Sequence, residues 1–160
     1  MAQDIFLKIS GIEGESQDAS HKGEIEVLGW NWGMNQESNM HNGSGGGAGK
    51  ATVEDLTFLH WTDRASPNLM KYCLIGKHIP EVLLTVRKAG GNPLEYLKIT
   101  MTDVIISGVR ATGERAKERV RETVSIAFSK VSHEYVVQNQ QGSSGGTVTG
   151  SFDIKGNKEC

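Results

Sequence analysis

One stretch, residues 66–78, carries both the start and the stop signals of an α-helix, whereas the rest of the chain has the patterns of strands and loops. Ser66 is predicted to accept a hydrogen bond from an unpaired amide of the first turn. Pro67 suits the first helical position because no amide is needed there, and Gly76 can adopt the left-handed conformation that ends a helix. The sequence therefore predicts a single sizeable helix over about residues 67–75.

The apolar residues of this segment predict one buried face. They follow the i, i+1, i+4, i+5 spacing of a helical stripe: Leu69, Met70, Cys73 and Leu74. A helix of roughly two and a half turns is marginal alone, so it should dock on a larger body through this stripe. Cys73 is predicted to be a small buried hydrophobic residue. With Cys160 as the second of only two cysteines, no disulfide framework is expected, which fits a reducing compartment.

Length and composition indicate what the larger body is. The 160 residues are predicted to form a single domain, 1–160, and 20 glycines against 3 prolines favour an antiparallel β architecture with many turns. A net charge of −2 argues against nucleic acid as a partner. Because no signal peptide and no apolar run of membrane-spanning length is found, membrane insertion is not expected, and any export should use another route.

The strand nearest the N-terminus is predicted from the alternation of Ile5, Leu7 and Ile9 with polar and aromatic neighbours. After a polar loop, residues 24–33 are predicted as one long strand. Its alternation places Trp30 and Trp32 on a core face, together with Leu28, and it places Asn31 on the opposite face. Packing in the core is the expected role of the two indoles.

The second half of the chain predicts further strands. Residues 82–88 and 94–101 should form a hairpin, and the apolar parity changes after Met101, as a bulge or bend would produce. The mixed charges of residues 110–122 predict a solvated excursion. The remaining strand segments are residues 123–129, extended or paired by 135–137, and 147–154.

The glycine-rich segment after residue 38 resembles two nucleotide-binding motifs without fitting either. A phosphate-binding loop needs Gly where Ser44 stands and a hydroxyl where Ala51 stands. Gly43-x-Gly45-x-x-Ala48 matches only a loose dinucleotide pattern. Both motifs must lead into a helix, whereas residues 52–61 have the pattern of a strand. A long loop is therefore expected, with no cofactor.

Catalytic and metal-binding patterns are equally weak. The five histidines lack the spacings that build metal sites. Gly142-x-Ser144-x-Gly146 spells a nucleophile motif, but the segment after it is predicted as strand where that motif needs a helix. Asp63, just before the helix, is expected to bind local amides rather than to act in catalysis. We predict no catalytic, metal or cofactor residue and no enzyme activity.

Several short motifs, in this order and spacing, resemble the hemolysin-coregulated protein (Hcp) family of bacterial type VI secretion systems. The resemblance covers nearly the whole chain and rests on Gly29-Trp30-Asn31-Trp32-Gly33, Gly47-Ala48-Gly49-Lys50, Asp55-Leu56-Thr57-Phe58, Asp63-x-x-Ser66-Pro67-Asn68-Leu69-Met70, Gly76-Lys77-His78, Val86-Arg87-Lys88-Ala89-Gly90, Tyr96-Leu97-Lys98-Ile99-Thr100 and Phe152-Asp153-Ile154-Lys155-Gly156-Asn157-Lys158. It implies a β-barrel with one flanking helix, assembled into hexameric rings that stack as the inner tube of a contractile injection device.

By the same resemblance, the partners are other copies in a homo-hexamer, stacked rings, a spike protein at the tube tip, a contractile sheath and small effectors in the lumen. The protein would be made in the bacterial cytoplasm and then ejected. Asn31 is expected on the lumen wall. The loop from Met40 to Val53 is expected to contact the next ring through Met40, Gly43, Gly45, Gly46, Gly47, Gly49, Lys50 and Val53. The alternative is a monomeric β-barrel module that binds a sugar or peptide.

Overall fold

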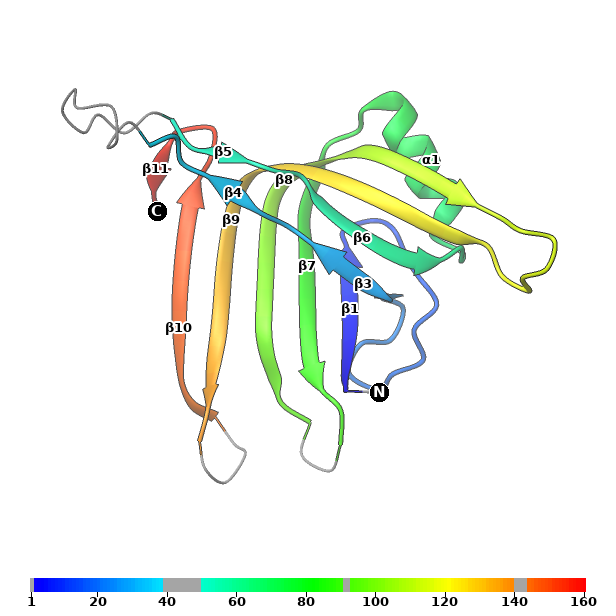
Figure 1. Cartoon of the computed structure of the whole chain (residues 1–160), viewed down its shortest axis with the longest axis horizontal. Helices are drawn as coiled ribbons and strands as arrows, with labels where there is room; N and C mark the ends of the chain where they lie inside the picture. Colours follow the sequence, from blue (N-terminus) through cyan, green and yellow to red (C-terminus); the bar gives the residue numbers. More distant parts are fainter. Residues whose placement is uncertain (1, 39–49, 91–92, 140–143) are drawn as a thin grey trace.

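A computed structural model describes residues 2–38, 50–90, 93–139 and 144–160 of the chain (Figure 1). These ranges are mainly β with one flanking helix, as the sequence predicts. The strands are β1 Gln3–Ile9, β2 Ile25–Glu26, β3 Gly29–Asn31, β4 Met34–Asn35, β5 Thr52–Val53, β6 Leu56–Trp61, β7 Ile79–Lys88, β8 Glu95–Thr112, β9 Arg121–Gln138, β10 Ser144–Asp153 and β11 Lys158–Glu159, and the helix is α1 Ser66–Ile75.

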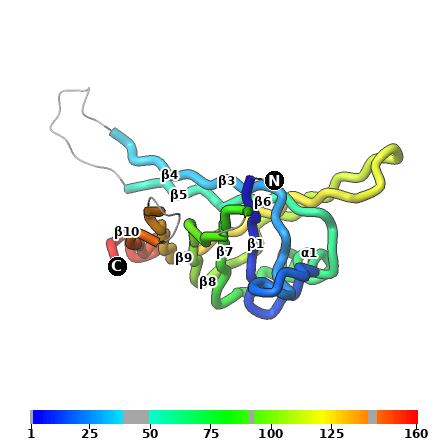
Figure 2. Tube along the Cα trace, turned by 90° about the horizontal axis from the view of Figure 1, so that it is seen from below, coloured from blue at the N-terminus to red at the C-terminus, as the bar shows by residue number. Residues whose placement is uncertain are grey.

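Two layers of strands enclose the core, and every strand pair is antiparallel. The main sheet has the order β11-β10-β9-β8-β7-β1-β2. Its long strands β8 and β9 also enter the second layer, because the first residues of β9 pair with β6, which in turn pairs with β3. In the view from below, β3 and β6 run along one side of the row formed by the main-sheet strands (Figure 2). The predicted hairpin of residues 82–101 is confirmed as β7 and β8.

The chain crosses from one layer to the other between β2 and β3. Here the amide of Val27 donates to the carbonyl of Ile5 at 2.9 Å, and the next amide, that of Leu28, donates to the carbonyl of Leu59 at 2.7 Å. The crossing brings an edge of each layer together, although the strands that the structure describes do not form a continuous closed ladder. The fold is therefore barrel-like, in agreement with the prediction.

This crossing corrects the prediction of one long strand over residues 24–33. The segment contains two short strands, and its parity changes between them: Val27 is buried and Leu28 is exposed, the reverse of what alternation predicts. The physical reason is that the segment exchanges its hydrogen-bond partner, β1, for β6. The prediction for Trp30 and Trp32 is confirmed, since both are partly buried and pack against the core.

The core lies between the main sheet and the second layer. Its largest fully buried side chains come from both, which is why each layer depends on the other for burial. They include Leu7, Leu84, Ile99 and Met101 of the main sheet and Leu56, Phe58 and Ile126 of the second layer. The predicted alternation of β9 is confirmed by buried Val124 and Ile126.

The predicted change of parity after Met101 is also confirmed. Met101 and Val104 are both buried although they are three positions apart, an odd spacing that strict alternation would send to opposite faces. Asp103 lies between them with a φ of 54°, the left-handed region that a non-glycine residue rarely adopts. Its carboxylate accepts a hydrogen bond from the Ser129 hydroxyl and contacts the His78 ring nitrogen, each at 2.8 Å, and these contacts hold the unusual conformation in place.

The helix begins and ends near the predicted residues, but its start is built differently. Gly76 closes the helix with a φ of 63°, as predicted. Ser66 is not the N-cap; the N-cap is Ala65, which makes no side-chain capping bond. The amide of Ala65 donates to Asp63 at 2.8 Å, which confirms the local role predicted for that aspartate. The Ser66 hydroxyl accepts from the Asp63 amide at 3.1 Å, so it bonds outside the first turn.

The predicted apolar stripe of α1 is only partly buried. Leu69 is fully buried and Cys73 is partly buried against the core. Met70 and Leu74 are 54% and 77% exposed, which contradicts the prediction for these two residues. The helix packs on the sheet through Leu69 and Tyr72, and the side of the stripe that Met70 and Leu74 occupy stays open.

A second, polar cluster holds the loop of residues 11–24 on the outer face of β1. Arg87 donates to Asp18 at 2.7 and 3.0 Å and to Asp4 at 3.0 Å, and its guanidinium lies 5.0 Å from the Phe6 ring. The hydrogen bond from Arg87 lowers the pKa of Asp18 to about 2. Phe6 stacks on His21 with ring centroids 4.3 Å apart, which explains why Phe6 is buried on the face opposite the core.

His21 gives this cluster a pH dependence. Its ring contacts Glu95 at 2.7 Å and Glu24 at 2.9 Å. Burial lowers the pKa of His21, but the hydrogen bonds to Glu95 and Glu24 together raise it by more than burial lowers it. The pKa of His21 therefore lies above its ordinary value. The contribution to stability should be complete below about pH 6.5 and should be lost as the pH rises through the folded-state pKa.

We expect His21→Gln to destabilise the protein more at about pH 5.5 than at about pH 8.5, because only the imidazolium attracts both carboxylates. Urea unfolding of both proteins at the two pH values measures this difference. His133→Gln, at an exposed position of β9, is the control and should show no such change. Equal destabilisation by His21→Gln at both pH values would contradict the assignment.

Candidate functional site

The motifs that resemble catalytic or nucleotide sites lack the helix that each requires. Ser144 of the Gly-x-Ser-x-Gly pattern begins β10, and the pattern's first residue, Gly142, lies outside the described residues. The glycine-rich segment is followed by the strand β5. Within the described ranges, His, Cys, Asp and Glu do not gather into a group that could hold a metal ion. In the same ranges, no helix has the length and apolar character of a membrane span.

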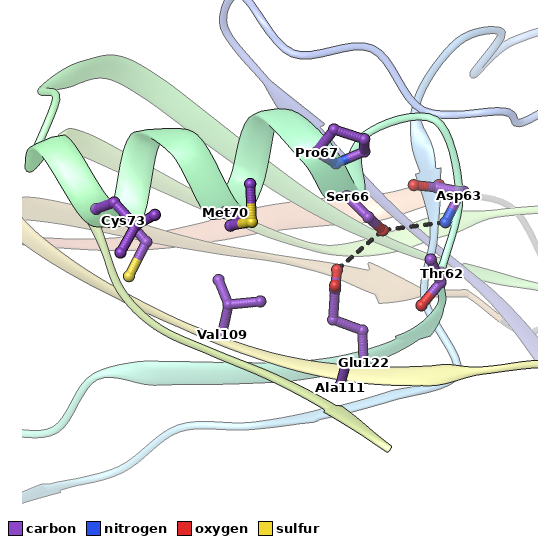
Figure 3. Close-up of a pocket in the computed structure, with 10 residues that line it drawn as sticks. Thr62, Asp63, Ser66, Pro67, Met70, Cys73, Val109, Ala111 and Glu122 are labelled. Atoms are coloured by element: carbon purple, nitrogen blue, oxygen red, sulfur yellow. Dashed lines mark hydrogen bonds between the residues drawn. The ribbon is translucent and has the colours of Figure 1, made fainter. Parts of the chain in front are cut away.

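The most conspicuous surface feature is an apolar groove between α1 and the sheet, which we term the helix groove (Figure 3). It encloses about 560 Å³. Met70 and Cys73 point from the helix toward Val109 of β8 (Figure 3). The groove is open to solvent on the side of the helical stripe where Met70 and Leu74 are exposed. Its lining residues are Thr62, Asp63, Ser66, Pro67, Met70, Cys73, Leu74, Val109, Ala111 and Glu122.

One end of the helix groove is polar. Glu122 of β9 is buried and accepts a hydrogen bond from the Ser66 hydroxyl at 3.0 Å, and the same oxygen lies 2.8 Å from His60 Nε2. The other ring nitrogen of His60 is buried 3.9 Å from Asp63 and has no hydrogen-bond partner among the described residues. Burial raises the pKa of Asp63. These groups tie the start of α1 to β6 and β9.

Sequence reasoning missed Glu122, which it placed in the solvated run of residues 110–122. The prediction is confirmed for residues 110–121, which are exposed at the projecting end of the β8–β9 hairpin, but it is wrong for Glu122. A signal was available, because Glu122 has the same parity as the buried Val124 and Ile126. Alternation along a strand sends all three side chains to the core face.

A second exposed apolar surface, the β9–β10 face, consists of Tyr135, Val137 and Val148. Tyr135 and Val148 are direct cross-strand partners and are 44% and 64% exposed. Tyr135 is also paired with Leu97, which is paired with the buried Val86. Because paired residues share a face, the β9–β10 face is the core face of the main sheet, continued beyond the residues that the second layer covers.

The helix groove and the β9–β10 face lie on opposite sides of the molecule, with β10 at one end of the main sheet and α1 toward the other (Figure 1). Soluble monomers rarely expose two such apolar areas, so both are candidate interfaces. The projecting β8–β9 hairpin extends further on the side of α1 (Figure 1).

The other predicted site residues lie apart from these surfaces. Asn31 is exposed on β3, as the alternation from Trp30 to Trp32 predicts. Lys50 is exposed, and Val53 is partly buried where β5 pairs with β4. The other residues assigned to the ring-stacking loop lie outside the described residues: Met40, Gly43, Gly45, Gly46, Gly47 and Gly49.

Comparison with known proteins gives one consistent result. A sequence model of the family described as "Type VI secretion system effector, Hcp" matches residues 6–135. Protein hcp1 of Pseudomonas aeruginosa is 46% identical over 162 residues, with all of both chains covered. The crystal structure of Hcp1 from Salmonella typhimurium is 56% identical and covers all of both chains, with a TM-score of 0.85.

A type VI secretion system effector from Yersinia pestis is also similar in structure. It is 45% identical, has a TM-score of 0.78, and the match covers 94% of this chain and 99% of that one. Both the sequence and the fold therefore agree over nearly the full length. The chain belongs to the Hcp family of type VI secretion system proteins.

Proposed function

We propose that this protein is the structural subunit of the inner tube of a type VI secretion system. Six copies form a ring, and rings stack into a tube inside a contractile sheath. The tube is ejected from the bacterial cytoplasm with a spike protein at its tip and carries small effectors in its lumen. Family membership supports the secretion role, and the exposed apolar surfaces support the assembly.

The observation that carries the proposal is the pair of unlike apolar surfaces on opposite sides of one domain, the helix groove and the β9–β10 face. Two unlike surfaces can pair head to tail between neighbouring copies, and a head-to-tail contact produces a closed ring when its rotation closes. The alternative, a monomeric module for a sugar or peptide, predicts a deep pocket lined by aromatic side chains. No aromatic side chain of the described residues lines the helix groove.

Light scattering and negative-stain electron microscopy of the purified protein test the proposal. A ring of six copies differs from a monomer roughly sixfold in mass and is visible as an annulus. Only monomer in solution, with no annular particles, would contradict the proposal and favour the alternative.

Asn31 is proposed to line the lumen of the ring. Its exposed side chain lies on β3 between the two partly buried tryptophans, on the face opposite the core. We expect Asn31→Gln to keep the hexamer intact and to change the amount of effector that copurifies with it. A cryo-electron microscopy map of the ring with Asn31 outside the channel would disprove this placement.

The loop from Met40 to Val53 is proposed to join stacked rings. Five glycines lie within residues 43–49, and ordering so flexible a chain costs about 1 kcal/mol or more per residue, so contacts in the next ring must compensate. Each contact between two rings should then be weak, and a tube should be held together because many copies of this weak contact act at once.

Deleting residues 43–47 should leave hexamers intact but abolish tubes and secretion. Light scattering, electron microscopy and immunoblots of culture medium measure these three properties. Loss of the hexamer, or unchanged tubes and secretion, would show that the loop has a different role.

A further inference from the structure

The residues that line the helix groove suit a particular partner: a cluster of apolar side chains, one of which carries a hydrogen-bond donor. Met70, Leu74 and Val109 form apolar walls, and the carboxylates of Asp63 and Glu122 lie at one end. Because ionised carboxylates act only as hydrogen-bond acceptors, this end of the groove suits a hydrogen-bond donor rather than an apolar group. With about 560 Å³, the groove accommodates several side chains rather than one.

The β9–β10 face presents such a cluster on the same chain. Val137 and Val148 are apolar, and Tyr135 has an apolar ring with a hydroxyl donor at its tip. Tyr135 contacts the Tyr96 ring edge to face, with centroids 6.2 Å apart. Within the described residues its hydroxyl forms no hydrogen bond, so the donor is available to a neighbour.

The positions of the two surfaces exclude a contact within one copy. The helix groove lies beside α1 and the β9–β10 face lies at the opposite end of the main sheet (Figure 1). Two surfaces on opposite sides of one molecule can contact each other only between two copies. Each copy then binds one neighbour through the helix groove and the other neighbour through the β9–β10 face.

We propose that the helix groove of each copy receives the β9–β10 face of the next copy, with Tyr135 directed toward the carboxylates of Asp63 and Glu122. The inference rests on the proposed ring and adds the identity of the two surfaces that form its interface. It also explains why Met70 and Leu74 are exposed in the isolated chain.

Cross-linking tests the pairing. Leu74→Cys and Val148→Cys place one thiol in each surface, in a chain whose own thiols are removed by Cys73→Ala and Cys160→Ser. Both new positions are exposed in the isolated chain, so the thiols are accessible. A short bismaleimide should join neighbours and give a ladder of covalent species up to six chains on denaturing gels.

The matched control replaces Val148→Cys with Thr149→Cys. Thr149 is the next residue of β10, is also exposed, and points to the opposite face of the sheet. It should give little or no ladder. A hexamer by light scattering that gives no ladder with Leu74→Cys and Val148→Cys, or equal ladders with Val148→Cys and Thr149→Cys, would overturn the pairing and leave the ring intact. A monomer would overturn the ring proposal itself.

The role of the Tyr135 hydroxyl is tested separately by Tyr135→Phe, which keeps the ring and removes the donor. If the hydroxyl binds a carboxylate in the interface, losing this hydrogen bond should raise the concentration at which the hexamer dissociates by about tenfold or more. Mass photometry over a dilution series measures this concentration. No change would show that the hydroxyl does not reach a carboxylate in the interface.

Discussion

Replacing Leu74 with aspartate is expected to convert hexamers into folded monomers. Leu74 is 77% exposed in the isolated chain, so the substitution places a charge in water and costs the domain itself little. In the proposed ring the same position is buried in the helix groove, where an unpaired carboxylate costs several kcal/mol at each contact. Light scattering should report a roughly sixfold fall in mass.

Circular dichroism and thermal unfolding must show that the Leu74→Asp protein is still folded. Asn68→Asp is the matched control, because it adds the same charge to the same helix at an exposed position that does not line the groove. The control should remain hexameric. If Leu74→Asp also remains hexameric at low concentration, the groove is not part of the ring interface.

Replacing Glu122 with alanine is expected to cause the largest loss of stability among single substitutions outside the apolar core. Glu122 accepts from the Ser66 hydroxyl and contacts His60, and all three groups are buried. Its removal takes away the hydrogen-bond partner of His60 Nε2 and leaves the Ser66 hydroxyl, which still accepts from the Asp63 amide, without an acceptor for its proton. Losing both bonds in a buried place costs about 3 kcal/mol. Urea unfolding at one fixed protein concentration measures the loss, since assembly also contributes to stability.

Two variants separate this network from a general effect of the substitution. Glu122→Gln keeps an acceptor oxygen for Ser66 and should cost less than Glu122→Ala. Glu118→Ala removes a carboxylate from the exposed end of the same hairpin and should change stability by no more than about 0.5 kcal/mol. A loss below about 1 kcal/mol for Glu122→Ala would mean that Glu122 does not hold the start of α1 in place.

The local features that the sequence predicted correctly depend on short-range geometry. Gly76 ends α1 in the left-handed conformation because that requirement belongs to the residue itself. The β7–β8 hairpin and the parity change at Met101 follow from alternation within one strand pair. The candidate site was predicted less well. Asn31 is exposed as expected, but most of the glycine-rich loop lies outside the described residues.

The errors occur where a segment meets two partners. Leu28 is exposed because the chain leaves β1 for β6 at that point, and periodicity within one segment carries no information about a change of partner. Ser66 did not cap the helix because a buried carboxylate 56 residues further along the chain accepts a hydrogen bond from its hydroxyl. Met70 and Leu74 have the spacing of buried residues, but the sheet beneath them does not cover the full width of the helix.

By itself, the sequence determined a mainly β domain with one helix, the bounds of that helix and the two tryptophans in the core, because spacing and backbone preference act over a few residues. Only the tertiary structure decided which apolar residues stay uncovered. The helix groove and the β9–β10 face exist because the second layer is smaller than the main sheet and because α1 packs on the sheet through part of its stripe. Coverage depends on the relative sizes and positions of whole layers, and no local pattern contains that information.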